Sequence, residues 1–120
     1  MNAITEGART AAFLLSEANG KFSRDNVAIA AGELAPGTVL GRVTATGKYV
    51  QFAPGAADGS ETVAGILYAA ADASAAEADG VAVVRQAELK GEELIWPEAI
   101  TAPQKTAAVA ALAVLGLIIR

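Results

Sequence analysis

Carboxylates are the residues of this chain that could do acid–base or metal chemistry, because the sequence contains neither cysteine nor histidine. Without those residues no Ser-His-Asp or Cys-His nucleophile can form, and the commonest metal ligand is missing. Glu92 and Glu93 are adjacent, but neighbours in a strand point to opposite faces, so we expect a solvated edge. Asp72, Glu77 and Asp79 could offer oxygens to calcium, yet their spacing differs from that of a calcium-binding loop. We therefore predict no catalytic residue, cofactor or metal site, and a protein that is not an enzyme.

Charge and hydropathy argue against two classes of partner, nucleic acids and membranes. The formal net charge is -4, and the basic residues are scattered from Arg9 to Arg120 without a cluster. A nucleic-acid binder needs such a cluster to neutralise phosphates. The most apolar stretch, residues 107–119, is shorter than the roughly 20 residues that span a bilayer, and Gly116 interrupts it. We therefore expect neither nucleic acid nor membrane as a partner.

The composition indicates one small domain that gains stability from association. With 120 residues, of which 53% are hydrophobic, the chain can form a single core. Alanine is abundant, however, and aromatic residues make up only 5%. Because an alanine methyl buries little surface, each core contact is weak. We therefore expect a modestly stable monomer that joins an oligomer or a larger assembly.

Residues 1–26 carry one apolar cluster, around Phe13, Leu14 and Leu15, among turn-forming and small residues. This pattern favours an extended arm outside the core. A short amphipathic helix over residues 10–18, packed on the domain, fits the same pattern. We leave both structures open.

Residues 27–93 alternate short apolar runs with turns that contain glycine or proline. In the turn at residues 35–37, proline fixes φ and glycine supplies a positive φ. Residues 70–80, rich in Ala, Asp and Ser, could form a loop or a short helix. The spacing of the runs is typical of a small barrel or folded sheet. Strands are expected over residues 27–30, 38–44, 49–52, 63–69, 81–85 and 87–90.

The last twenty residues predict a capped helix followed by a strand. Thr101 is a good N-cap, Gln104 completes a capping box, and Pro103 is tolerated in the first turn. The helix is expected over residues 106–115, and Gly116 is a suitable residue to end it. Residues 117–119 are then expected to form a last strand that returns to the sheet.

Trp96 is the only tryptophan, and Pro97 follows it. A tryptophan buries a large area, so a core anchor is the first interpretation. A subunit-interface anchor is the second, because tryptophan is enriched where proteins bind most tightly. An aromatic residue before proline also leaves the peptide isomer open.

Three stretches of the sequence resemble the head decoration protein family of bacteriophages, whose best-known member belongs to phage lambda. They are the VAGIL strand at residues 63–67, the LIWPEA segment at 94–99 and the closing segment at 105–119. The likeness is looser over residues 27–62, where LAPGTVLG at 34–41 is similar to prophage relatives. Residues 1–26 depart from the lambda pattern, so the capsid contacts of the lambda protein are least transferable to this segment.

The resemblance implies a mainly β fold, a small barrel of the β-clip or β-tulip kind with one short C-terminal helix and an extended N-terminal arm. It implies a homotrimer that binds the major capsid protein on the outside of the expanded head and resists the pressure of packaged DNA. The protein would be found in the virion, and in the host cytoplasm during assembly. Residues 1–26 would be a flexible capsid-binding arm, and residues 27–120 the decoration domain.

An arm with exposed backbone can add a strand to a neighbouring sheet, while its apolar side chains fill pockets. Deleting residues 1–26 should then leave a folded trimer that no longer binds capsids. The expected arm contacts are Phe13, Leu14, Leu15, Ser16, Asn19 and Phe22. The candidate core or trimer-interface anchors are Trp96, Pro97 and Glu98.

Two other classes of function compete with decoration. A small carbohydrate- or ligand-binding accessory domain is possible, because β-clip folds also serve that purpose, but it would need a pocket lined by several aromatic residues. A glycosidase-like enzyme that uses only carboxylates is disfavoured by the size of the chain and by the absence of a plausible acid pair.

Overall fold

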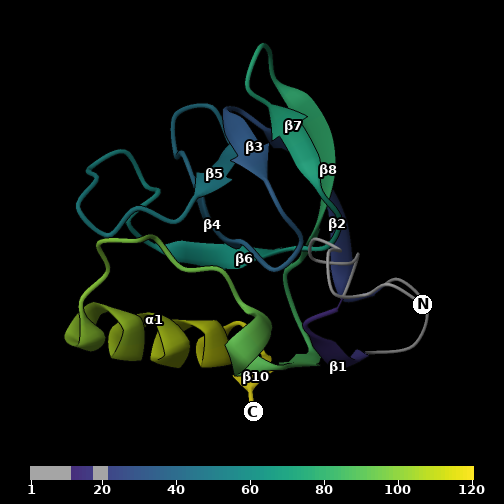
Figure 1. Ribbon diagram of the computed structural model, residues 1–120, viewed down its shortest axis with the longest axis vertical. Helices are drawn as coiled ribbons and strands as arrows, with labels where there is room; N and C mark the ends of the chain where they lie inside the picture. Colours follow the sequence, from purple (N-terminus) through teal and green to yellow (C-terminus); the bar gives the residue numbers. More distant parts are fainter. Residues whose placement is uncertain (1–11, 18–21) are drawn as a thin grey trace, which may run out of the picture.

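The computed structural model describes residues 12–17 and 22–120 and shows a β-barrel beside a layer made of one helix and a small sheet (Figure 1). The C-terminus lies at the end of the molecule that carries this layer. The strands are β1 (Leu14–Glu17), β2 (Arg24–Ile29), β3 (Gly32–Leu34), β4 (Val39–Arg42), β5 (Tyr49–Gln51), β6 (Val63–Leu67), β7 (Ala71–Ala73), β8 (Ala78–Val83), β9 (Ala87–Leu89) and β10 (Leu117–Ile119). The helical elements in the described part of the chain are α1 (Ala102–Val114) and the 3-10 helix η2 (Gly91–Glu93).

The barrel is closed in the order β2-β5-β4-β6-β8. The long antiparallel pair of β2 and β8, from Arg24↔Val83 to Ile29↔Ala78, completes the circle. Its interior is filled by buried Ile29, Leu40 and Leu67 together with small residues. The mainly β class, the barrel and the C-terminal helix are therefore confirmed.

The second sheet has the order β1-β9-β10 and lies beside α1 (Figure 1). β10 runs parallel to β9, with Leu117 opposite Ala87, and β1 pairs on the other side, with Leu14 opposite Leu89. A second apolar cluster joins this layer to the barrel and contains Phe13, Val39, Phe52, Val63, Ile66, Val83, Ala87, Leu89, Leu94, Ala108, Leu112 and Leu117.

The capping box predicted at the start of the C-terminal helix and the glycine predicted at its end are both confirmed. The Thr101 side chain accepts a hydrogen bond from the Gln104 amide at 3.2 Å, and the Gln104 side chain accepts one from the Thr101 amide at 2.9 Å. Gly116 has φ of 87°, the left-handed conformation that ends a helix at low cost for glycine. The helix begins at Ala102, earlier than predicted. Pro103 lies in its first turn, where proline is tolerated because its missing N–H would have no partner within the helix.

Residues 70–80 form neither the helix nor the simple loop that were considered. Ala71–Ala73 is strand β7, which pairs antiparallel with β3, and β8 begins at Ala78. Alanine has little strand preference of its own, so this pairing depends on partners elsewhere in the fold.

The described part of residues 1–26 packs on the globule, whereas the capsid-binding role of this segment stays a prediction. Phe13 is 1% exposed in the core, Leu14–Glu17 pairs with β9, and Arg24–Ile29 is a wall of the barrel. Deleting residues 1–26 would remove Phe13 and cut β2 in half, so we now expect an unfolded chain. Sequence reasoning missed this because the partners of both strands lie far along the chain.

Replacing Phe13 by alanine should lower the free energy of unfolding by about 3–5 kcal/mol, the usual cost of emptying a buried aromatic site. Leu15→Ala is the matched control, because Leu15 is 51% exposed, and should cost about 0.5 kcal/mol or less. Urea unfolding followed by tryptophan fluorescence measures both. Equal losses for the two variants would contradict the placement of Phe13 in the core.

Candidate interaction surface

The solvent side of the β1-β9-β10 sheet presents exposed apolar side chains beside Glu88, which pairs with Arg120 at 3.0 Å. Ser16 and Ile118 both lie opposite Glu88 in the register, and Ile118 is 39% exposed. The register of β1 shifts between Leu14 and Ser16, so Leu15 is an extra residue, as in a β-bulge, and both Leu15 and Ser16 are exposed. We call Leu15, Ser16, Glu88 and Ile118 the outer sheet face.

β1 forms one edge of this sheet. Within residues 12–17 and 22–120, no strand pairs with its outer side. Unpaired backbone groups on an exposed edge can pair with a strand of another protein. The outer sheet face therefore adjoins an edge suited to strand addition.

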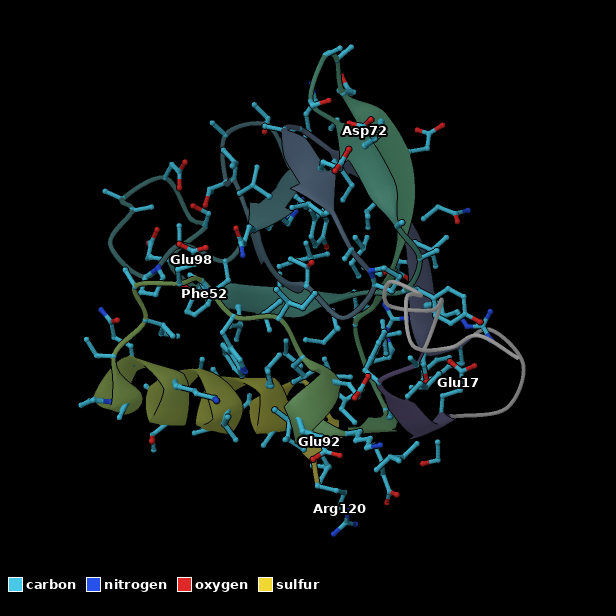
Figure 2. All side chains as sticks on the ribbon, in the orientation of Figure 1. Glu17, Phe52, Asp72, Glu92, Glu98 and Arg120 are labelled. Carbon is cyan, nitrogen blue, oxygen red and sulfur yellow. The ribbon has the colours of Figure 1, made fainter. Side chains whose placement is uncertain are left out.

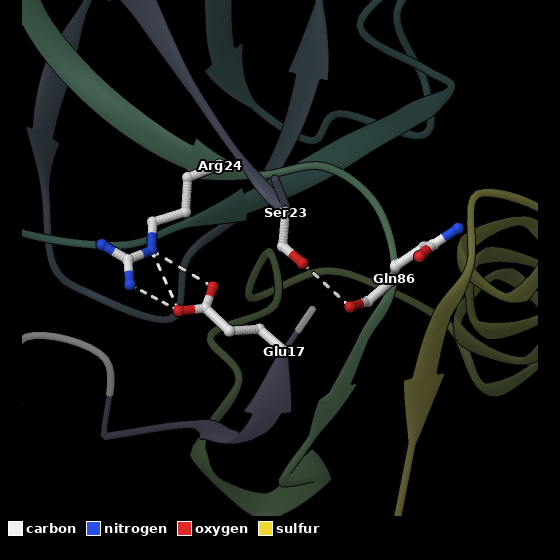
Figure 3. Close-up of polar contacts among 4 residues, drawn as sticks. All are labelled: Glu17, Ser23, Arg24 and Gln86. Carbon is white, nitrogen blue, oxygen red and sulfur yellow. Dashed lines mark hydrogen bonds and ion pairs between the residues drawn. The ribbon is translucent and has the colours of Figure 1, made fainter. Parts of the chain in front are cut away.

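An ion pair holds β1 against the barrel (Figure 3). Arg24 Nε donates to Glu17 Oε1 at 3.2 Å and to Oε2 at 3.1 Å, and its Nη2 also contacts Oε1. The guanidinium lies 4.3 Å from the centroid of the Tyr68 ring, a favourable cation–π distance. The hydrogen bond from Arg24 holds the pKa of Glu17 below its ordinary value, although partial burial opposes this. Glu17 and Arg24 thus fix the edge strand in position.

A second link joins the residues just before β2 to the connection between β8 and β9. The Ser23 hydroxyl donates to the carbonyl of Gln86 at 2.9 Å (Figure 3). Arg85 donates to the Phe22 carbonyl at 2.6 Å and to Asp25 at 2.9 Å, and lies 5.4 Å from the Phe22 ring centroid. Phe22 is nevertheless 55% exposed, so its ring is oriented but available for contact.

The residues predicted as capsid contacts therefore separate into two groups. Phe13 is in the core, and Leu14 packs against that core. Leu15, Ser16 and Phe22 are exposed. Asn19 lies outside the described residues, as do residues 1–11 and 18, 20 and 21. Ile118 was missed as a surface residue, although its alternation with Leu117 in a predicted strand could have indicated it.

Trp96 packs its ring against the core cluster. The ring meets Phe52 edge to face, with centroids 6.5 Å apart, and the Lys105 ammonium lies 5.5 Å from its centroid. Its buried Nε1 has no hydrogen-bond partner among the described residues, so the ring contributes through packing. The Trp96–Pro97 peptide is not cis, as is true of every peptide bond the structure describes. Pro97 is partly buried and Glu98 is exposed, and the interface role of these three residues stays a prediction.

The carboxylates that the structure describes do not converge on a site. Glu92 and Arg120 lie at one end of the molecule and Asp72 at the other (Figure 2). Asp72 accepts hydrogen bonds from the Ser74 hydroxyl at 2.5 Å and from its amide at 3.0 Å, which lower the pKa of Asp72 and stabilise a turn. In the described ranges, no group of three or more His, Cys, Asp or Glu side chains could hold a metal ion. None of the helices described is both long and apolar enough to cross a membrane.

The model of the family described as Bacteriophage lambda head decoration protein D matches residues 3–117, nearly the whole chain. No curated protein matches the sequence.

Replacing Glu17 by glutamine should destabilise the protein at neutral pH, and the difference should vanish in acid. The folded state lowers the pKa of Glu17, so its stabilisation is present above the ordinary glutamate value of about 4.3. It is lost as the pH falls through the lowered value. Urea unfolding of wild type and Glu17→Gln between pH 7 and acid measures the difference. Glu92→Gln is the control, since the Glu92–Lys90 pair is solvent-exposed and should contribute little. A difference that persists in strong acid would contradict the role of the ion pair.

Proposed function

Because the chain belongs to the Bacteriophage lambda head decoration protein D family, we propose that it binds as a homotrimer to the exterior of the expanded phage head and stabilises it against the pressure of packaged DNA. The observation that carries the proposal is the family match over residues 3–117. A role in decorating phage capsids, and a place in the virion, follow from membership itself. The finer proposal is that the partner is the major capsid protein, reached in the host cytoplasm during assembly.

The outer sheet face is the surface that we propose docks on the major capsid protein. It combines exposed Leu15 and Ile118 with an edge strand that can pair with a capsid strand. Phe22, also exposed, is the third apolar contact that we assign to the capsid. The capsid-binding role expected of an arm is thereby assigned to residues anchored on the folded domain.

Because these apolar contacts are small, binding as a trimer would strengthen attachment to the head. Full burial of a Leu or Ile side chain contributes roughly 1.5–3 kcal/mol. Leu15 is 51% and Ile118 39% exposed, so each can contribute only part of that on docking. One copy would bind weakly after the entropy cost of association. Three linked copies bind far more tightly, because the second and third contacts form at high effective concentration.

The described aromatic residues do not favour the carbohydrate-binding alternative. Phe52 is buried against Trp96, whose ring also has Lys105 beside it, and Arg24 lies over Tyr68. Sugar-binding pockets need several aromatic faces open to one cavity. We therefore retain decoration as the proposal, with a structural rather than a catalytic role.

The double substitution Leu15→Glu with Ile118→Glu should weaken binding to expanded heads by at least roughly tenfold, because two charges would be desolvated in the contact. Binding is measured by sedimentation with expanded and unexpanded heads, and wild type should sediment with the expanded form. Thermal unfolding checks that the variant folds.

Ala75→Glu is the matched control. Ala75 is exposed and lies between β7 and β8, at the end of the molecule away from the outer sheet face (Figure 1). The Ala75→Glu variant should bind expanded heads as tightly as wild type does. If the folded double variant saturates heads at wild-type concentrations, the outer sheet face is not the docking surface.

A further inference from the structure

We propose that the outward face of α1 is where copies of this chain contact one another around the three-fold axis of the trimer. This inference rests on the proposed function and names the surface that makes the trimer. We call this surface the helix face; it consists of Pro103, Thr106, Ala107, Ala110, Ala113 and Val114, all of which are exposed.

The helix face is one continuous stripe along α1. At 100° per residue these positions lie on one side of the helix, opposite Ala108 and Leu112, which are buried against the core. Val114 is 87% exposed, the highest value among the exposed large hydrophobic residues. An apolar side chain left in water at the end of an alanine stripe indicates a surface that gains stability when another molecule covers it.

The helix face carries no charge. Lys105 is the only charged residue in α1, and its ammonium lies beside the Trp96 ring rather than on the stripe. A solvent-exposed helix normally carries charged residues on its outer side. Thr106 is the one side chain of the stripe that can form a hydrogen bond.

The absence of charge favours a second copy of this chain over a different protein. Near a rotation axis each side chain meets the same side chain of its neighbours. Any charge there would therefore face its own sign, which is unfavourable. The whole chain carries a formal net charge of -4, so copies repel one another elsewhere and approach best at an uncharged surface. A different partner would have no such requirement, and could use complementary charges.

The small side chains suit a close helix contact. Packed helices lie about 8–10 Å apart, and alanine permits the short end of that range. A helix of 13 residues is about 20 Å long, so the contact is small and self-association should be moderate. α1 leads through Gly116 directly into β10, and the Gly116 carbonyl accepts from Ala87 of β9 at 3.1 Å. Joining the helix faces would therefore also fix the relative orientation of three outer sheet faces.

Charge substitutions at Ala110 test the inference, since glutamate and lysine are good helix formers and should leave α1 folded. Ala110→Glu and Ala110→Lys are each expected to weaken self-association at least roughly tenfold in sedimentation equilibrium. An equimolar mixture of the two variants should recover part of the association, because a mixed trimer replaces two of its three like-charge contacts by opposite-charge ones. Ala75→Glu is the control and should associate like wild type.

A cysteine at the same position provides a second measurement that also detects weak association. The chain contains no cysteine, so Ala110→Cys introduces a single thiol. Mild oxidation in solution and on decorated heads should give covalent pairs of copies, whereas Ala75→Cys should stay single. Thermal unfolding establishes that each variant is folded.

The outcomes separate this inference from the proposed function. Unimpaired trimers of both charge variants, with no cross-link at position 110, would place the trimer contact elsewhere and overturn the inference while decoration stands. Charge variants that still form trimers but lose head binding would show that α1 contacts the capsid instead, which also overturns it. Covalent pairs linked at position 110, in a protein that does not bind expanded heads, would support the helix face and overturn decoration.

Discussion

An apolar core lies between the β-barrel and the layer formed by α1 and the β1-β9-β10 sheet, and the surfaces of the molecule depend on it. Leu112 of α1, Leu117 of β10 and Leu89 of β9 are all fully buried there. Phe13 adds the residue just before β1 to the same cluster. Aromatic side chains are few and alanines many, so these large side chains supply most of the area that holds the two layers together.

The core also explains why the proposed contact surfaces can be rigid although each is small. β9 is central in its sheet, and the core holds it from one side, so the opposite side carries the outer sheet face. The Glu17–Arg24 pair then fixes the edge strand against the barrel. A docking surface built on fixed strands loses little entropy when it binds. A small entropy loss matters here because each contact is weak. Stabilisation of the head would come from many copies bound to one shell.

The apolar cluster at residues 13–15 shows the limit of reading this sequence alone. Its three large side chains look equivalent in sequence, yet Phe13 is buried, Leu14 is partly buried and Leu15 is exposed. The partner strand β9 lies far along the chain, and the shift in register decides which side chains face the core. An isolated arm and a paired edge strand have the same local pattern, so only the pairing could separate them.

The sequence by itself determined the absence of cysteine and histidine chemistry, the class of fold and the capped C-terminal helix with its following strand. Those features depend on residue types, or on contacts between residues close in the chain, as in the Thr101–Gln104 capping box and the positive φ of Gly116. Only the tertiary structure decided the closure of the barrel, the pairing of β3 with β7, the burial of Phe13 and the exposure of the helix face. Each of those features depends on segments that are distant in sequence. A side chain is buried only when other parts of the chain pack over it.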